Sequence, residues 1–311
     1  YSDAVDDNAA TFTNTYKATG TLVGSEKLQV SKVLEGREWI ERDNFKVTIS
    51  SADTNAPMPE DKKTTIELNR YSRNSAFGDI NYTEKDIGKT YIYTIKETAG
   101  NAGGMTYSKA EYQVVVTIKD NGNGTLDVSS TMTKVRDDDG TEDSAEIKEN
   151  TAAFTNTYKA DPADDVMIGA GAGAKLTKIF EAGTRGWKDT DKFTFKIAQN
   201  TEEDKYEIDL DTVTKGVQNE ATVTVGKPSS GNTANFTFGP YTFEYADTYH
   251  FTVMEQNGGQ TIDGITYDGH VANVTVIVED KGTGKLTATV AISDGKFTNT
   301  YGINPGETYD L

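Results

Sequence analysis

The sequence contains no cysteine and only two histidines among its 311 residues. Without cysteine the chain cannot form the disulfides that brace many small secreted domains, so an extracellular role would require another source of stability. His250 and His270 make neither a catalytic triad nor a zinc site. We interpret both as ordinary surface or strand residues, and we expect no metal and no other cofactor.

Long apolar runs and an excess of positive charge are also missing. No stretch approaches the ~18 consecutive apolar residues of a membrane-spanning helix. The formal net charge is −18, whereas nucleic-acid binding requires a basic surface. We therefore expect no membrane insertion and no nucleic-acid partner for this segment. Since neither a signal region nor a cell-wall sorting motif is recognisable, we expect the sequence to be a piece of a longer chain.

One five-residue word, Phe-Thr-Asn-Thr-Tyr, occurs three times, at residues 12–16, 154–158 and 297–301. Copies about 140 residues apart are spaced like domains and indicate tandem modules. Other words recur in the same order before the second and third copies. They are Val-Ser-Lys-Val-Leu-Glu and Leu-Thr-Lys-Ile-Phe-Glu around Lys32 and Lys178, a Trp at 39 and 187, Tyr91–Glu97 and Tyr249–Glu255, and Gly104–Tyr107 and Gly264–Tyr267.

Within the modules, apolar and polar residues alternate as in β-strands. Val114, Val116 and Ile118 alternate before a Gly-rich turn, and no segment sustains the 3.6-residue apolar period of a helix. We therefore predict an all-β fold of two tandem β-sandwich domains. The predicted boundaries are 1–16 for the last strand of a preceding repeat, 17–158 for the first domain, 159–174 for a linker, 175–301 for the second domain and 302–311 for an exit segment.

In each module three polar residues fall on the apolar face of a strand. Side chains alternate with period two, so that Lys32, for example, shares its face with Val30 and Leu34. The residues placed in this way are Lys32, Glu97 and Asn156 in the first module and Lys178, Glu255 and Asn299 in the second. Burial of one unpaired charge costs several kcal/mol, so the three groups of each module must compensate one another.

Two interpretations of these clusters remain open from the residues alone. The first is a buried Lys–Glu ion pair with Asn as a hydrogen-bond partner. The second is chemical, because burial lowers the pKa of Lys and raises that of Glu. A neutral amine beside the carboxamide carbon, with a protonated Glu polarising the carbonyl, can form an amide and expel ammonia while Glu shuttles the protons.

Both modules resemble the intramolecular isopeptide-bond domains of Gram-positive pilins and surface adhesins, the collagen-adhesin B-type group with an inverse immunoglobulin-like sandwich. The resemblance is carried by the Lys near the first strand, the strand that begins with Tyr and ends with Glu, and the terminal Phe-x-Asn-x-Tyr. These motifs appear in this order twice and cover nearly all of residues 20–301. The resemblance implies bonds between Lys32 and Asn156 and between Lys178 and Asn299, with Glu97 and Glu255 as catalysts.

The function that the resemblance implies is structural. The chain would be a stalk or shaft segment of a pilin or adhesin on an extracellular, cell-wall-anchored bacterial surface, with single-turnover self-crosslinking rather than enzymatic activity. Its partners would be neighbouring repeats, with sortase-linked subunits or a host ligand. The alternative is an adhesin module that recognises a host protein or glycan through loops in 51–82 or 200–248. A hydrolase is disfavoured, since no catalytic constellation is present.

Several residues compete for roles in this scheme. Lys27 and Lys175 lie close to the favoured lysines, and only the alternation with apolar neighbours argues against them. Asn14 has no preceding Lys and Glu here, so we expect it to be unreacted. A bond from Asn14 to Lys32 would span only 18 residues and is disfavoured. The acidic run 137–143 lacks the ligand order of an EF-hand, which favours a solvated hairpin tip over a calcium site.

Overall fold

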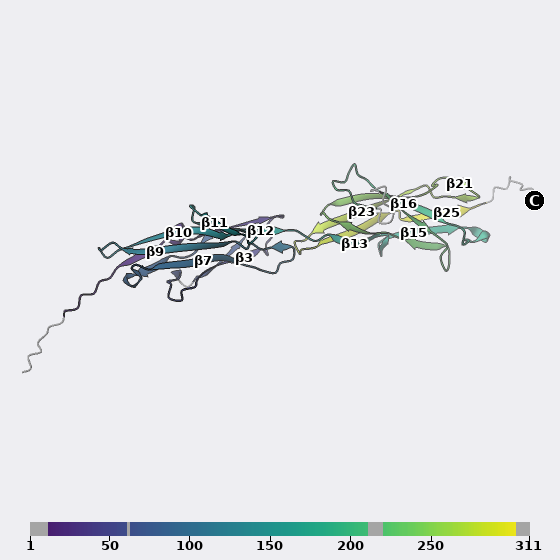
Figure 1. Ribbon diagram of the computed structural model, residues 1–311. Coiled ribbons are helices and arrows are strands. Elements are labelled where there is room, and N and C mark those ends of the chain that lie inside the picture. The colour runs from purple at the N-terminus through teal and green to yellow at the C-terminus, as the bar shows by residue number, and fades with distance from the viewer. Residues whose placement is uncertain (1–11, 61–62, 211–219, 303–311) are drawn as a thin grey trace, which may run out of the picture. The chain divides into compact units, whose positions relative to one another are not determined.

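The computed structural model describes residues 12–60, 63–210 and 220–302, and it divides the chain into two compact units, Tyr1–Lys159 and Ala160–Leu311. In Figure 1 the first unit is coloured from purple to teal and the second from teal to yellow. The only α-helix among the described residues is α1 (Gly24–Lys27), which is accompanied by the 3-10 turns η2 (Glu84–Asp86) and η3 (Gly183–Arg185). The prediction of an all-β fold is confirmed. No helix in these ranges is long and apolar enough to cross a membrane.

The first unit is built from two facing sheets and a short two-stranded ribbon. Its strands are β1 (Thr19–Leu22), β2 (Gln29–Glu35), β3 (Asn44–Ser51), β4 (Thr65–Asn69), β5 (Asn74–Ala76), β6 (Ile80–Thr83), β7 (Thr90–Thr98), β8 (Met105–Thr106), β9 (Glu111–Asp120), β10 (Leu126–Arg136), β11 (Glu142–Glu146) and β12 (Thr151–Tyr158). A six-stranded sheet has the order β11-β10-β9-β7-β3-β4, and a four-stranded sheet has the order β5-β2-β12-β8. Strand β1 pairs with β6.

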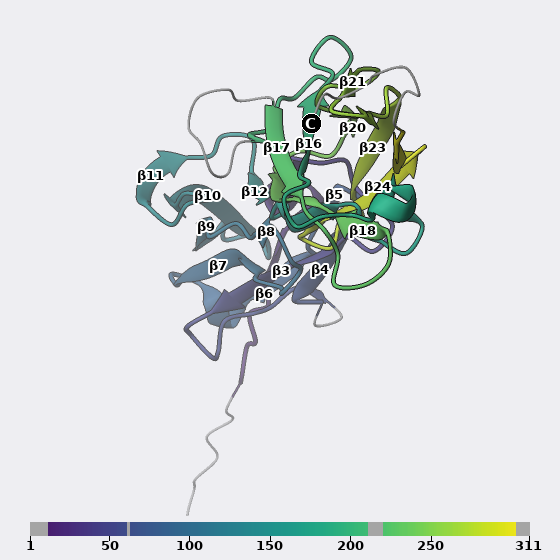
Figure 2. The same cartoon turned by 90° about the vertical axis from the view of Figure 1, so that its right-hand side faces the viewer.

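The second unit repeats this plan. Its strands are β13 (Ala163–Ile168), β14 (Ala170–Gly171), β15 (Ala174–Glu181), β16 (Phe193–Gln199), β17 (Glu220–Val225), β18 (Thr233–Phe236), β19 (Phe238–Phe243), β20 (Thr248–Glu255), β21 (Thr261–Ile262), β22 (Ile265–Thr266), β23 (Val271–Asp280), β24 (Leu286–Ser293) and β25 (Lys296–Tyr301). One sheet runs β17-β16-β20-β23-β24, of which β16, β20 and β23 are seen in Figure 2. The other runs β14-β15-β25-β22-β21, with β18 paired to β15.

Period-two burial fixes which face of each strand meets the core. In β7 the side chains of Tyr91, Tyr93 and Ile95 are buried, whereas Ile92 on the opposite face is exposed. A sandwich packed from two such sheets buries one face of each, which is why the alternation in the sequence reports the core correctly. Burial of an aromatic or branched side chain in such a core contributes roughly 1.5–3 kcal/mol.

The first and last strands of the main fold lie side by side and parallel in both units. In the first unit β12 pairs with β2, with Phe154 opposite Lys32. In the second unit β25 pairs with β15, with Phe297 opposite Lys178. The chain segments that open and close each sandwich are therefore neighbours, although more than a hundred residues separate them in the sequence.

The predicted linker 159–174 is largely structured. Strand β13 pairs with β19, and Ala163 and Ile168 are buried in the core of the second unit. The small residues of this stretch predicted a linker, whereas its few apolar side chains pack against the sandwich. At the other end, residues 12–17 form no strand and are exposed. The remaining parts of the predicted terminal segments, 1–11 and 303–311, lie outside the described residues.

Candidate functional site

The six polar residues that the period-two alternation places on apolar strand faces gather into two buried clusters, one in each unit. In the first unit the Nζ atom of Lys32 on β2 lies 2.9 Å from Glu97 Oε2, and the Nδ2 atom of Asn156 on β12 donates to Glu97 Oε1 at 2.9 Å. Glu97 reaches the other two residues from β7 in the facing sheet. The side chains of Lys32 and Glu97 are 0% exposed.

The second unit reproduces this geometry closely. Lys178 Nζ on β15 lies 2.9 Å from Glu255 Oε2, and Asn299 Nδ2 on β25 donates to Glu255 Oε1 at 2.8 Å. Glu255 belongs to β20 of the facing sheet. All three residues are buried. In both clusters one carboxylate thus spans the amine of Lys and the amide nitrogen of Asn with its two oxygens.

Aromatic rings surround each lysine amine. Lys32 Nζ lies 5.0 Å from the ring centre of Phe45, and Lys178 Nζ lies 4.5 Å from that of Phe193. The Trp that recurs after each Lys packs edge-on against this Phe, with ring centres 5.3 Å apart for Trp39 and 5.4 Å for Trp187. The repeated Trp and Phe positions therefore form the apolar wall that excludes water from the amine.

Burial shifts the pKa values of Lys and Glu in both clusters. It lowers the pKa of Lys32 below the usual value and lowers the pKa of Lys178 to about 8, although the neighbouring carboxylate pulls the other way. Burial likewise raises the pKa of Glu97 and of Glu255 against the opposing effect of the lysines. The two shifts converge, so that transfer of a proton from the amine to the carboxylate costs far less than in water.

The carbonyl oxygen of each asparagine has a different partner from the one expected. Asn156 Oδ1 accepts from the backbone N–H of Ser108 at 2.6 Å, and Asn299 Oδ1 accepts from the backbone N–H of Asp268 at 2.8 Å. A backbone N–H can only donate, so these contacts fix which end of each amide is the oxygen. The expectation that Glu polarises the carbonyl is therefore wrong for this geometry, since Glu contacts the amide nitrogen.

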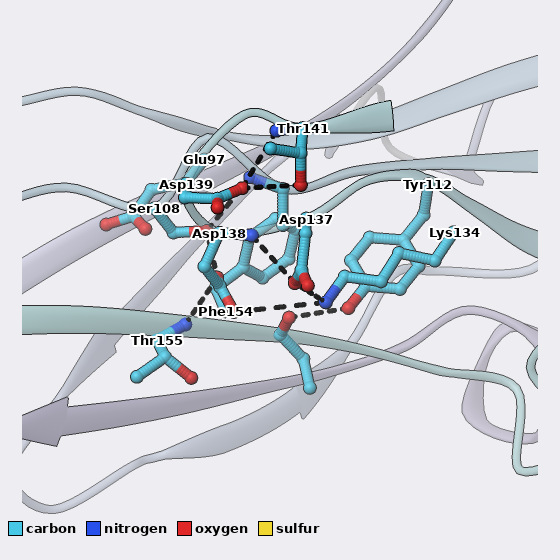
Figure 3. Close-up of polar contacts among 12 residues, drawn as sticks. Glu97, Ser108, Tyr112, Lys134, Asp137, Asp138, Asp139, Thr141, Phe154 and Thr155 are labelled. Atoms are coloured by element: carbon cyan, nitrogen blue, oxygen red, sulfur yellow. Dashed lines mark hydrogen bonds and ion pairs between the residues drawn. The ribbon is translucent and has the colours of Figure 1, made fainter. Parts of the chain in front are cut away.

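A second carboxylate holds the strand beside each asparagine. In the first unit Asp138 Oδ1 accepts from the backbone N–H of Thr155 at 2.9 Å and from the hydroxyl of Ser108. Figure 3 shows Asp138 between these two residues, with Lys134 beside it. The acidic run 137–143 was assigned to a solvated hairpin tip, yet Asp138 at this tip turns back toward the cluster.

In the second unit the same position is filled from another part of the chain. Asp268 Oδ2 accepts from the backbone N–H of Thr298 at 2.6 Å, and Asp268 Oδ1 lies 2.7 Å from His270 Nδ1. His270 Nε2 lies 2.7 Å from the carbonyl oxygen of Asp294. The His270 ring also stacks on Phe297, with ring centres 4.3 Å apart. His270, predicted to be an ordinary residue, thus belongs to the surroundings of the site.

The sequence contained a signal for these supporting residues. Ser108 and Asp268 each directly follow the recurring word that ends in Tyr107 and Tyr267, so they occupy equivalent positions. The position directly after the repeated word therefore identifies both residues. Asp138 had no such signal, because the hairpin that carries it has no counterpart in the second unit.

The competing residues of the sequence lie elsewhere. Lys175 is exposed, and Lys27 is only half-buried at the end of α1. Asn14 is exposed and lies outside any strand. The strand that carries Lys32, β2, has β5 and β12 as its neighbours, so Asn14 does not pair beside Lys32. Within the described ranges no group of three or more His, Cys, Asp or Glu residues is arranged to hold a metal ion.

Comparison with known proteins gives a family match over most of the chain. The model of FctA, the Spy0128-like isopeptide containing domain, matches residues 28–159 and again residues 174–302. None of the curated proteins matches the sequence significantly.

Among solved structures, similar chains include two major pilins from Streptococcus pyogenes. The T-13 pilin is 16% identical with a TM-score of 0.32, and the alignment covers 91% of this chain and 99% of the pilin. A second major pilin is 14% identical with a TM-score of 0.28, and 93% of this chain and 99% of that one are covered. The pilus-presented adhesin Spy0125 (Cpa) is 8% identical with a TM-score of 0.23, with coverages of 92% and 99%.

Proposed function

The chain belongs to the FctA family of Spy0128-like isopeptide-containing domains, of which it carries two copies, and we propose that it is a structural segment of a bacterial pilus or surface adhesin stiffened by one Lys–Asn isopeptide bond in each unit. Domains of this pilin type imply a bacterial surface location and are typically not enzymes. Anchoring to the cell wall, linkage to other subunits by a sortase and contact with a host ligand are further parts of this proposal.

The observation that supports crosslinking is the placement of one Glu against both nitrogen atoms that exchange protons. Lys32 Nζ forms a bond to Asn156 Cγ, and the amide nitrogen of Asn156 leaves as ammonia. Glu97 delivers one proton to the leaving nitrogen through Oε1 and takes one from Nζ through Oε2, so that it ends as it began. Lys178, Asn299 and Glu255 perform the same reaction in the second unit.

The proposed bonds would stabilise the units chiefly through the unfolded chain. Each closes a loop of about 120 residues, for which the loop-entropy relation derived for disulfides gives about 5 kcal/mol. Each also joins two neighbouring parallel strands, β2 to β12 in the first unit and β15 to β25 in the second, so that tension along the chain passes through a covalent bond instead of the hydrogen bonds between those strands. This supplies the stability that a chain without cysteine must find elsewhere.

The intact mass of the purified chain tests the proposal. We expect a deficit of two ammonia molecules relative to the sequence, with Asn156→Ala and Asn299→Ala each restoring one. Asn14→Ala is the matched control, because Asn14 lies in the same five-residue word and should leave the deficit at two. A mass equal to that of the unmodified sequence would reduce both clusters to buried ion pairs.

A hollow in the second unit favours glycan recognition as a second candidate function. The described residues around it enclose about 390 Å³ and include Tyr206, Tyr241 and Tyr245. The rings of Tyr206 and Tyr245 stack 4.3 Å apart, and Tyr245 is 51% exposed. Aromatic side chains together with a few polar groups are typical of pockets that bind small ligands. Binding on a glycan array that is lost in Tyr245→Ala and retained in the equally exposed Ile92→Ala would support this candidate, and an array without binding would exclude it.

A further inference from the structure

The carbonyl oxygen of the reacting amide needs its own stabilising group. When Nζ attacks Cγ, the electron pair of the C=O bond moves to Oδ1, where negative charge develops in a buried site. Glu97 cannot stabilise this charge, since its two oxygens already contact Nζ and Nδ2. The atom that faces Oδ1 is the backbone nitrogen of Ser108, and in the second unit that of Asp268.

We propose that the backbone N–H groups of Ser108 and Asp268 are the oxyanion donors of the crosslinking reaction, and that the carboxylates of Asp138 and Asp268 are positioning groups that hold donor and amide together. This assignment rests on the proposed crosslinking. A donor already aimed at the oxygen strengthens as charge develops and needs no reorganisation, which is why such groups have large effects in acyl-transfer sites.

The positioning role of Asp138 follows from what it connects. Its Oδ1 atom accepts from the Ser108 hydroxyl, in the loop that provides the donor, and from the Thr155 N–H, one residue before the reacting Asn156. The backbone carbonyl of Asp138 also accepts from Lys109 N–H at 2.9 Å. One hairpin tip therefore links the loop of the donor to the strand of the acceptor (Figure 3).

In the second unit a single residue combines both functions. The N–H of Asp268 faces Asn299 Oδ1, while its carboxylate accepts from Thr298 N–H, again one residue before the reacting asparagine. The donor N–H thus comes from equivalent positions in the two units, whereas the carboxylate on the preceding N–H comes from different chain segments. A carboxylate binds this particular N–H in both units although it comes from different segments, and this recurrence is the observation behind the shared positioning role.

Replacement of the donor amide by an ester tests the oxyanion role. Lactic acid introduced at position 108 during cell-free synthesis removes the N–H and otherwise resembles Ser108→Ala, which serves as its reference. Ammonia loss is followed in quenched, digested samples, and the second unit of each molecule serves as an internal standard. We expect crosslinking of the first unit to slow on the order of 10²-fold while the second keeps its rate.

An ester at Lys109 is the matched control, because it removes a neighbouring N–H that bonds to the backbone carbonyl of Asp138 on the hairpin and does not contact Asn156. It weakens one positioning contact but leaves the donor to Asn156 Oδ1 in place, so we expect it to slow crosslinking much less than the ester at 108. Equal slowing by the two esters would reduce the Ser108 N–H to a structural contact and overturn the assignment, as would an unchanged rate with the ester at 108. If the Ser108→Ala reference and the second unit both keep their ammonia, crosslinking itself is refuted and the assignment falls with it.

Moving the carboxylate from position 138 to position 108 tests its positioning role. Asp138→Asn should slow crosslinking of the first unit about tenfold or more, since small displacements of reacting groups have effects of this size. Asp139→Asn is the control, because Asp139 accepts only from Thr141 within the tip. Adding Ser108→Asp to Asp138→Asn copies the second unit and should restore the rate. An unaltered rate in Asp138→Asn would overturn the positioning role, and so would a slowed rate that Ser108→Asp fails to restore.

Discussion

The two units reach the same cluster of Lys, Glu and Asn with different supporting groups. In the first unit β10 continues to Arg136 and a hairpin with β11 follows, so that Asp138 at its tip can return to the cluster. In the second unit β24 ends at Ser293 and β25 begins three residues later, so no hairpin exists and Asp268 provides the carboxylate from another loop.

Comparison of the two units shows which contacts around the cluster are present in both and which side chains differ. Both units keep the buried Lys–Glu–Asn cluster, a loop N–H on the amide oxygen and a carboxylate on the preceding N–H of the last strand. The basic side chain beside that carboxylate varies: Lys134 Nζ lies 3.9 Å from Asp138, whereas His270 Nδ1 lies 2.7 Å from Asp268. The shared contacts are made to the Asn side chain and to the N–H of the residue before it. The side chains that differ, Lys134 and His270, lie beside the carboxylates.

The largest effect is expected from removing the shared catalyst in one unit at a time. Glu97→Gln and Glu255→Gln should each abolish one crosslink and lower the free energy of unfolding of that unit by about 5 kcal/mol, since the two closed loops are nearly equal in length. Intact mass and chemical denaturation measure both effects. Glu67→Gln is the control, because Glu67 is half-exposed on β4. If one of the two variants still lost two ammonia molecules while the other lost only one, the two units would not be equivalent.

A pH titration should distinguish the units more finely. Both ring nitrogens of His270 face acceptors, which favours the doubly protonated ring. Burial lowers the pKa of His270, but the hydrogen bonds to Asp268 and Asp294 outweigh it and raise the pKa above the usual value. The stabilisation is therefore complete below the unfolded value of about 6.5 and is lost as the pH rises through the raised value.

We expect the hydrogen-exchange protection of the Thr298 N–H to fall relative to that of Thr155 as the pH rises through this range. The equivalent contact in the first unit has Lys134 in place of a histidine. Burial lowers the pKa of Lys134, but the hydrogen bond to Asp137 outweighs it and raises the pKa further above neutral. His270→Gln should make the ratio of the two protection factors independent of pH. A ratio that already stays constant in the unchanged chain would remove the distinction between the units.

The smallest effect is expected from an Arg–Asp brace that the units share. Arg37 binds both oxygens of Asp43 at 2.7 Å, and Arg185 binds those of Asp191 at 2.8 Å. Replacement by Lys keeps the charge and loses the paired geometry, so Arg37→Lys and Arg185→Lys should each cost about 1 kcal/mol. Thermal unfolding in the Glu97→Gln/Glu255→Gln background would measure this. Clearly unequal costs would show that the braces are not equivalent.

The period-two alternation of apolar residues was enough to predict the fold class and which polar residues meet in each core. Burial on a pleated strand follows directly from this period. The alternation could not predict the partner of the amide oxygen. The Ser108 N–H belongs to a loop, and loop conformation leaves no periodic trace in the sequence. Asp138 was missed for a related reason: an acidic turn reads as solvated unless the donors that face it are known.

The parallel register of β2 and β12 also bears on errors of folding. A slip of one residue would turn Asn156 away from Lys32 and Glu97, because alternate side chains point to opposite faces. A misaligned unit could therefore not seal itself and would remain open to unfolding and proteolysis. The proposed reaction would therefore fix only the correct register by a covalent bond and would leave every other register reversible.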